Sequence, residues 1–234
     1  MLKAIRFELN GADEEQLKKD IYKKEYSQKD MVKESIEKYI DMDATIDGSK
    51  LSEDWFPGIE ADVFISHSHK NEDIAFGLKN KIESKTNHKC FVDSFVWGNS
   101  IDLLRTIDNK YCKFANGNTY DYNKRNYSTS HVYLMLNVAL QKMIFKSQFV
   151  IFLDTPKSIT VKDTISSSTN SPWIYSEISM VNWICEFQKL CKSIESVKQF
   201  SITENLKIKH NLDFSNFKRV SSLDKLLKIL NEWK

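Results

Sequence analysis

Residues 61–69 read ADVFISHSH, a short apolar strand that runs directly into a cluster of small polar and imidazole side chains. The residues that follow, Glu72–Ser84, are predicted to form an amphipathic helix, because their apolar side chains recur at helical spacing. In an open α/β sheet, ligands bind just beyond the carboxyl ends of the strands. Ser66, His67 and the two residues after them therefore occupy a place where a site is expected, although polar loops after strands are common.

Downstream of this stretch, strand-like and helix-like patterns alternate. Strands are predicted at Lys89–Val92, Phe149–Leu153, Val197–Ile202 and Leu206–Ile208, and helices at Pro172–Cys191 and Leu223–Trp233. The strand at residues 149–153 is entirely apolar, which is typical of a strand buried on both faces. We therefore predict an α/β fold with a mainly parallel sheet that helices cover on both faces.

The N-terminal quarter of the chain has a different pattern, and we predict a boundary at Pro57-Gly58. Residues 1–58 are expected to form a mostly helical extension, and residues 59–234 the main domain. Within the extension, Lys3–Leu9 suggests a short edge strand and Asp13–Met42 suggests surface helices. The apolar cluster Trp55–Pro57 is expected to fasten this region to the rest of the protein.

A second interruption, at about residues 99–147, is predicted to be an insertion after the second strand of the main domain. It holds an irregular polar stretch at residues 120–131, followed by a predicted helix over Val132–Lys146. Four polar side chains lie close together in that stretch: Arg125, Ser128, Ser130 and His131. They favour either the wall of a binding site or a capping turn in which one of the serines opens the helix.

Composition limits the classes of function. Of the 234 residues, 41% are hydrophobic and 12% aromatic, which is typical of a globular protein. The 34 basic and 32 acidic residues nearly balance, which argues against a dedicated nucleic-acid surface. No apolar run is long enough to span a membrane, and the charged N-terminal region does not resemble a secretory signal. We therefore expect a cytoplasmic protein that binds neither nucleic acid nor membrane.

The four cysteines lie far apart in the sequence: Cys90, Cys112, Cys185 and Cys191. This spacing favours reduced, mostly buried thiols in a cytoplasmic protein. A zinc site that combines them with His67, His69 or His131 stays open as an alternative, but no pair of cysteines has ligand spacing. We therefore predict no metal site.

Residues 171–178 read SPWIYSEI and predict the start of a helix. Ser171 suits the N-cap and Pro172 suits the first helical position, where its missing N–H costs nothing. Trp173 and Glu177 are one turn apart and lie along one flank of the helix. Taken alone, Glu177 has a structural interpretation: a carboxylate near a helix N-terminus contributes about 0.3–1 kcal/mol through the helix dipole.

Four segments in order carry a resemblance to a known family: residues 62–69, residues 91–93 with the loop to residue 100, residues 149–156, and residues 173–178. Together they resemble the Toll/interleukin-1 receptor (TIR) domain family. They are most similar to the bacterial, NAD-consuming members, in which a tryptophan precedes a glutamate by four residues on the third helix. The resemblance extends from Asp62 to the C-terminal helix. The N-terminal extension and the insertion at 99–147 depart from the family pattern.

The resemblance implies a flavodoxin-like sheet, and NAD⁺ as the substrate with no further cofactor. It assigns Glu177 as the catalytic residue and Trp173 as its neighbour in the site. It also implies that Ser66 and His67 approach the nucleotide. Asp93–Ser100, which includes Trp97, would match a loop that gates the site and helps assembly. Arg125 and His131 are added as substrate-binding candidates from their position in the insertion, because no family motif covers them.

The chemistry of NAD⁺ suits so small a set of residues. Glycosidases ordinarily need two carboxyl groups, one of which protonates the leaving oxygen. In NAD⁺ the nicotinamide is already cationic and departs neutral, so one glutamate can stabilise the positive ribose electrostatically. Attack by water would give ADP-ribose, and attack by the adenine would give a cyclic ADP-ribose. His67, His69 and His131 stay open as general bases.

We therefore expect a TIR-type NAD⁺ glycohydrolase or cyclase, acting in bacterial anti-phage defence. The resemblance also implies a homo-oligomer or an assembly of TIR domains, and a downstream effector that senses the nucleotide product. Two alternatives stay open. One is a non-enzymatic TIR module that docks to other proteins, because fold alone does not determine function. The other is an N-glycosidase that acts on a different nucleoside or nucleotide.

Overall fold

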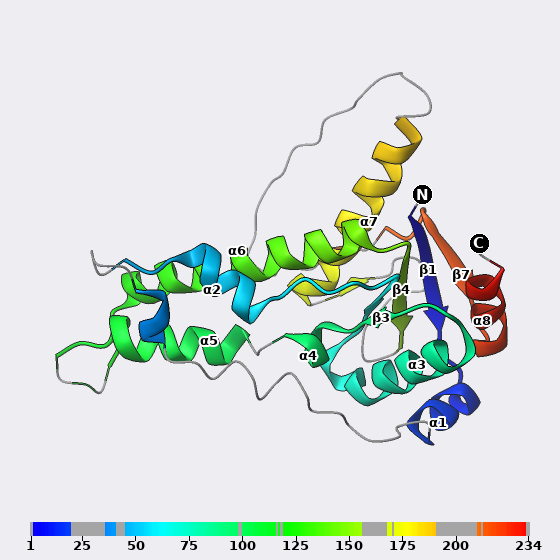
Figure 1. The fold of residues 1–234 in the computed structure, drawn as a ribbon, viewed down its shortest axis with the longest axis horizontal. Coiled ribbons are helices and arrows are strands. Elements are labelled where there is room, and N and C mark those ends of the chain that lie inside the picture. Colours follow the sequence, from blue (N-terminus) through cyan, green and yellow to red (C-terminus); the bar gives the residue numbers. More distant parts are fainter. Residues whose placement is uncertain are drawn as a thin grey trace. The chain divides into compact units, whose positions relative to one another are not determined.

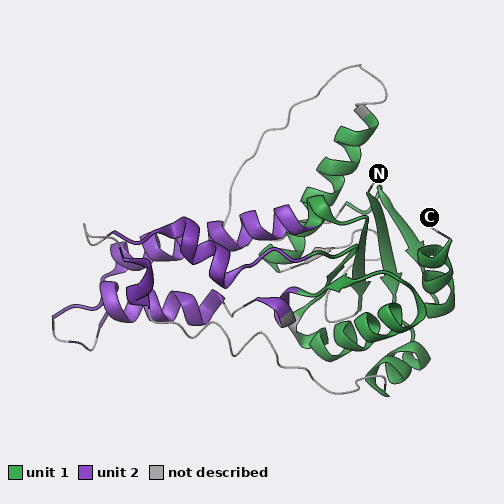
Figure 2. Cartoon of the chain, viewed as in Figure 1, with its two compact units in different colours: residues 1–22, 60–92, 144–234 green, residues 23–59, 93–143 purple. Residues whose placement is uncertain are grey.

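The computed structural model describes residues 2–19, 36–40, 45–97, 100–115, 117, 119–155, 168–169, 171–190, 210–211 and 213–232. The chain divides into two compact units (Figure 2). Unit 1 comprises residues 1–22, 60–92 and 144–234, and unit 2 comprises residues 23–59 and 93–143. The first 22 residues, which we predicted as part of an extension, thus belong to the same unit as the sheet.

Unit 1 is built on a five-stranded sheet in which every strand pair is parallel. The strand order is β3-β2-β4-β1-β7 (Figure 1). The strands are β1 (Lys3–Glu8), β2 (Val63–Ser66), β3 (Cys90–Phe91), β4 (Phe149–Asp154) and β7 (Phe217–Val220). This arrangement confirms the predicted α/β class with a flavodoxin-like parallel sheet.

Helices cover the sheet of unit 1 on both faces. They are α1 (Gly11–Lys19), α3 (Glu72–Lys85), α7 (Pro172–Leu190) and α8 (Leu223–Asn231); a short 3₁₀ helix, η2 (His69–Asn71), connects β2 to α3. Every side chain of β2 and the first five of β4 are buried. Because successive side chains of a strand point to opposite faces, burial along the whole strand requires cover on both faces. A two-stranded antiparallel ribbon, β5 (Ser168–Thr169) with β6 (His210–Asn211), completes the unit.

The position of β1 corrects one sequence prediction. We expected an edge strand, but β1 lies inside the sheet, where it pairs with β4 on one side and β7 on the other (Figure 1). Half of its residues are charged, which is unusual inside a sheet. One of them, Arg6, is satisfied within the sheet, because its guanidinium lies 2.7 Å from the carboxylate of Asp154 at the end of β4. Ile5 and Phe7 are fully buried.

The last strand, β7, was missed by the sequence analysis because its residues, FKRV, are half polar and only Val220 is buried. The strands predicted at Val197–Ile202 and Leu206–Ile208 lie outside the described residues. The helices predicted at 72–84, 172–191 and 223–233 are confirmed to within two residues at each end.

A glycine sets the contact between α1 and α3. A Cβ atom placed on Gly77 would lie 2.8 Å from the carbonyl carbon of Leu17 and would collide with its oxygen. Leu17 itself is fully buried. Only glycine therefore allows the two helix backbones to approach this closely.

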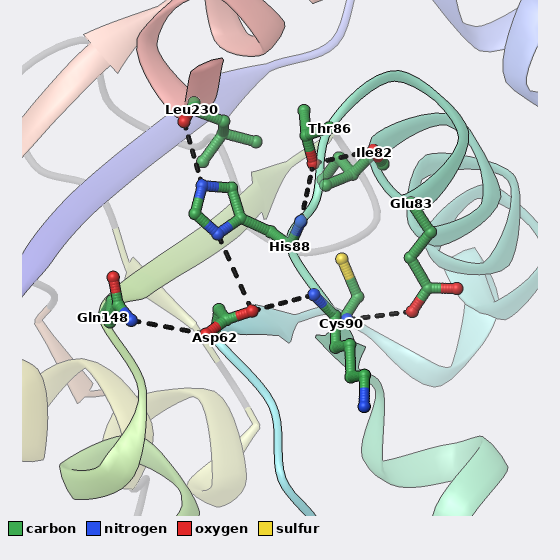
Figure 3. Close-up of polar contacts among 9 residues, drawn as sticks. Asp62, Ile82, Glu83, Thr86, His88, Cys90, Gln148 and Leu230 are labelled. Atoms are coloured by element: carbon green, nitrogen blue, oxygen red, sulfur yellow. Dashed lines mark hydrogen bonds and ion pairs between the residues drawn. The ribbon is translucent and has the colours of Figure 1, made fainter. Parts of the chain in front are cut away.

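The amino ends of the strands are closed by a polar network (Figure 3). Asp62 accepts hydrogen bonds from the Lys89 amide at 3.0 Å and from the Gln148 side chain at 3.3 Å. The His88 ring lies 2.9 Å from the Leu230 carbonyl oxygen, through Nε2, and 3.7 Å from the Asp62 carboxylate, through Nδ1. These contacts join the starts of β2, β3 and β4 to α8, and they lie at the sheet edge opposite to the expected site.

Unit 2 is helical in its described part. Its elements are η1 (Ile36–Tyr39), α2 (Gly48–Trp55), α4 (Asp93–Val96), α5 (Ser100–Ile107), the π-helical turn η3 (Asp108–Cys112) and most of the 25-residue helix α6 (Tyr122–Lys146). The apolar cluster at Trp55–Pro57 makes contacts within this unit. The Phe56 ring contacts Trp97 edge to face at 5.6 Å, and the Trp97 indole N–H donates to the Pro57 carbonyl oxygen at 2.8 Å.

The start of α6 corrects a second prediction. The helix begins at Tyr122, ten residues before the predicted start, so neither Ser128 nor Ser130 caps it. Asp121 serves as the cap: its carboxylate accepts from the amides of Asn123 and Lys124 at 2.9 and 3.1 Å. The Ser130 hydroxyl lies within the helix and donates to the carbonyl oxygen of Asn126 one turn earlier, at 2.8 Å.

Candidate functional site

Two side chains that are far apart in the sequence meet at the carboxyl end of β2. Ser66 is the last residue of the strand, and its register partner on β4 is Phe152. Register partners point to the same face of a sheet, and Phe152 packs there against Ile174 and Ile178 of α7. Ser66 therefore faces α7, and its hydroxyl donates a short hydrogen bond to the carboxylate of Glu177. Ser66 is 2% exposed and Glu177 is 6% exposed.

The first turn of α7 forms as the sequence predicted. Pro172 opens the helix, and the Ser171 hydroxyl accepts a hydrogen bond from the Ile174 amide at 3.4 Å. The apolar side chains Ile174 and Ile178 face the sheet, which directs Glu177 toward the end of β2. A carboxylate that served only the helix dipole would need no such burial. The geometry therefore favours a specific role for Glu177 over the purely structural interpretation.

A second buried polar pair lies at the same edge of the sheet. The Asn71 side-chain amide donates to the Thr155 hydroxyl oxygen at 2.6 Å, and both residues are buried. Asn71 ends η2, which follows β2, and Thr155 comes directly after β4. The sequence analysis missed both residues. A signal for Thr155 existed, because it follows the apolar strand β4 in the same way that Ser66 ends β2.

An ion pair between β1 and β4 also lies at the carboxyl ends of the strands. Arg6 contacts the Asp154 carboxylate through Nε and Nη2, each at 2.7 Å. Its guanidinium also lies over the Phe214 ring, 4.3 Å from the ring centre. Burial raises the pKa of Asp154, and the hydrogen bond and charge of Arg6 oppose this increase. The carboxyl ends of β2 and β4 thus gather several buried polar groups, as expected for a ligand edge.

The other predicted site residues divide between the two units. His67 follows Ser66 and Trp173 lies one turn before Glu177, so both belong to unit 1, and both are partly buried. Asp93, Trp97, Arg125 and His131 belong to unit 2. Trp97 is buried against Phe56, which gives it a packing role there. The assignment of these six residues to substrate binding stays a prediction.

Arg125 and Ser128 take part in a network within unit 2. The buried carboxylate of Asp108 accepts from Arg125 Nε at 2.9 Å and from the Ser128 hydroxyl at 2.5 Å. The Cys112 thiol lies 3.7 Å from the same hydroxyl. His131 is exposed, and its ring contacts Tyr127 edge to face at 4.4 Å. These contacts connect the π-helical turn to the first half of α6.

The described cysteines are free and buried: Cys90, Cys112 and Cys185. Burial raises the pKa of all three thiols, most strongly that of Cys90. Cys191 lies outside the described residues. In the described part of the chain, no three His, Cys, Asp or Glu side chains are grouped as metal ligands would be. None of the helices in these described residues has the length and apolar character needed to cross a membrane.

Comparisons of the chain with models of protein families, with curated proteins and with solved structures returned no match. Support for a function therefore comes from the residues themselves. The most specific feature is the buried contact between Ser66 and Glu177, because it brings together two motifs that the sequence analysis had singled out separately.

Proposed function

We propose that this protein is a TIR-type NAD⁺ glycohydrolase or cyclase that cleaves the bond between nicotinamide and ribose. One observation carries the proposal: the hydrogen bond between Ser66 and Glu177, which are 111 residues apart, at the carboxyl end of β2. The resemblance to TIR enzymes implies that the first residue approaches the nucleotide and that the second is catalytic. Their contact at the ligand edge of a parallel sheet supports both assignments together.

The proposed mechanism needs one negative charge in a site that largely excludes water. The pyridinium of NAD⁺ leaves as neutral nicotinamide, so the protein supplies no proton to the leaving group. Positive charge develops on the ribose as the bond breaks, and the Glu177 carboxylate stabilises it. Because Glu177 is almost fully buried, this interaction is much stronger than it would be in water. Ser66 orients the carboxylate before the substrate arrives.

The fate of the ribose determines the product. Water would give ADP-ribose, and the adenine of the same molecule would give a cyclic ADP-ribose. In bacterial anti-phage defence, the first outcome depletes NAD⁺ and the second supplies a signal for a downstream effector. We further propose that activity depends on assembly of several copies of the chain, as the family resemblance implies. The rate per chain should then rise with protein concentration.

The proposal is tested by incubating the full chain with NAD⁺ over a range of protein concentrations. We expect release of nicotinamide, with ADP-ribose or a cyclic ADP-ribose as the second product, measured by liquid chromatography. A panel of nucleosides and nucleotides without nicotinamide serves as the control and should stay intact. Cleavage of that panel with NAD⁺ untouched would favour the alternative N-glycosidase, and an intact NAD⁺ pool at every concentration would contradict the proposal.

A second candidate function, a non-enzymatic TIR module, is favoured by an aromatic patch on α7. Trp183 and Phe187 are 61% and 53% exposed, and their rings stack with centres 5.9 Å apart. Exposed aromatic side chains are enriched where proteins dock. A chain that assembles through Trp183 and Phe187, as judged by light scattering of alanine variants, but cleaves no NAD⁺ would favour this function.

A further inference from the structure

Unit 2 contains a cavity whose described lining includes neither Ser66 nor Glu177. Its volume is about 680 Å³, which falls in the range of small-molecule sites. Leu51 of α2, Ile107 of α5 and Met135 of α6 supply apolar wall. Tyr111 of the π-helical turn, together with Lys124 and His131 of α6, supplies polar groups. All of these residues belong to unit 2, so the cavity is formed within that unit alone.

The wall that Tyr111 contributes is held in place by the hydrogen bonds of a buried carboxylate. The π-helical turn is a rare conformation that occurs often at functional sites. It begins at Asp108, whose carboxylate is hydrogen-bonded to Arg125 at 2.9 Å and to Ser128 at 2.5 Å. Because both partners lie on α6, these hydrogen bonds join the turn to the helix. A wall that is fixed before binding reduces the entropy lost on binding.

The polar groups of the cavity favour a negatively charged ligand. No aspartate or glutamate is among the described residues that line it. Lys124 makes no ion pair with any described residue, so its ammonium group is available. The Tyr111 hydroxyl is buried; the neighbouring Lys110 ammonium interacts with its oxygen, but no described group accepts a hydrogen bond from its O–H. Such a group costs about 1–3 kcal/mol unless something binds it. A ligand that accepts a hydrogen bond would remove this cost.

We propose that this cavity binds a small amphipathic organic anion. Its apolar or aromatic body packs between Leu51, Ile107 and Met135, and its anionic head accepts from the Lys124 ammonium and the Tyr111 hydroxyl. The inference does not depend on the proposed function, because it uses no residue of the Ser66–Glu177 site. It therefore stands or falls independently of any activity toward NAD⁺.

The test uses two fluorescent probes with the same body and different charge. 8-Anilinonaphthalene-1-sulfonate carries a sulfonate, and N-phenyl-1-naphthylamine lacks it. We expect the sulfonate probe to bind the full chain saturably at one site, about fivefold more tightly than the neutral probe. Non-saturable binding, or equal affinity for the two probes, would overturn the proposal.

Four variants locate the binding. Lys124→Met should abolish the preference for the sulfonate, and Lys124→Arg should retain it. Lys142→Met is the matched control, because Lys142 is exposed on the same helix and does not line the cavity. This substitution should leave the affinity for both probes unchanged. Met135→Trp should fill the cavity and weaken the binding of both probes. Binding that is the same in Lys124→Met as in the wild type would overturn the proposal, even if Met135→Trp failed to fold.

Discussion

At the scale of single residues, the contact between Ser66 and Glu177 connects folding with the proposed chemistry. A buried carboxylate is tolerated only when hydrogen bonds satisfy it, so the Ser66 hydroxyl contributes to stability as well as to orientation. The identities of these two residues were weak evidence for a functional site. A serine at a strand end and a glutamate near a helix start are both common, and their meaning depends on the fold that brings them together.

Ser66→Ala should destabilise the protein by about 1–3 kcal/mol, because it removes a donor from a buried carboxylate. Urea unfolding followed by circular dichroism measures this change in the free energy of unfolding. Ser68→Ala is the matched control, since Ser68 is partly exposed and makes a 3.4 Å contact with the Lys70 amide. Equal losses of stability in the two variants would show that the Ser66 contact has no special weight.

The residues of the candidate site were predictable to different degrees. Ser66 was a candidate because it ends a strand, whereas Glu177 became one through the family resemblance, since its place at a helix start alone favoured a structural interpretation. Thr155 follows the apolar strand β4 and could have been found from that pattern, whereas Asn71 belongs to no such pattern. Only the tertiary fold brings the two side chains within 2.6 Å of each other. Arg125 was identified as a candidate from its polar surroundings, but its contact with Asp108 could not be foreseen.

At the scale of helices and strands, hydrophobic periodicity predicted the elements whose formation depends on nearby residues. The helices α3, α7 and α8 were predicted because their apolar residues recur every three or four positions. The start of α6 was not, because residues 122–131 are rich in Asn, Ser, Thr and Tyr, which are poor helix formers. The cap by Asp121 and the buried contacts of Asp108 outweigh that low propensity.

Gly77 gives the sharpest test of packing between helices. Gly77→Ala should destabilise the protein by about 1–3 kcal/mol, because the added Cβ collides with the backbone of α1. Gly11→Ala is the matched control: Gly11 begins α1 and nothing lies within 4 Å of its added Cβ. Alanine there should be neutral or stabilising by up to about 1 kcal/mol. The midpoints of urea unfolding compare the two, and a stable Gly77→Ala variant would contradict the close packing.

At the scale of the whole molecule, strand order was beyond the reach of sequence patterns. Counted from β2, the order β3-β2-β4 follows the flavodoxin-like arrangement, and the next place is taken by β1 from the N-terminus. β1 pairs with strands 146 and 213 residues later, as the registers of Lys3 with Phe149 and Ala4 with Phe217 show. Local propensity carries no information about such distant partners.

The same strand order also positions the two residues of the proposed site, Ser66 and Glu177. Because β2 and β4 are parallel neighbours, their carboxyl ends share one edge, and α7 packs across that edge. The site is thus a property of the sheet and not of either motif alone. The central claim is that the negative charge of Glu177, held at this edge, stabilises the ribose cation formed from NAD⁺.

The most direct test is the comparison of wild type with Glu177→Gln, which removes the charge but keeps the size of the side chain and an acceptor for Ser66. Binding of NAD⁺ is measured by calorimetry, and nicotinamide release under saturating NAD⁺ is measured by chromatography. The charge hypothesis predicts similar binding, with release slowed by about 10²-fold or more. Glu186→Gln, an exposed change on the same helix, should keep the wild-type rate. Nicotinamide release by Glu177→Gln at the wild-type rate would contradict the claim.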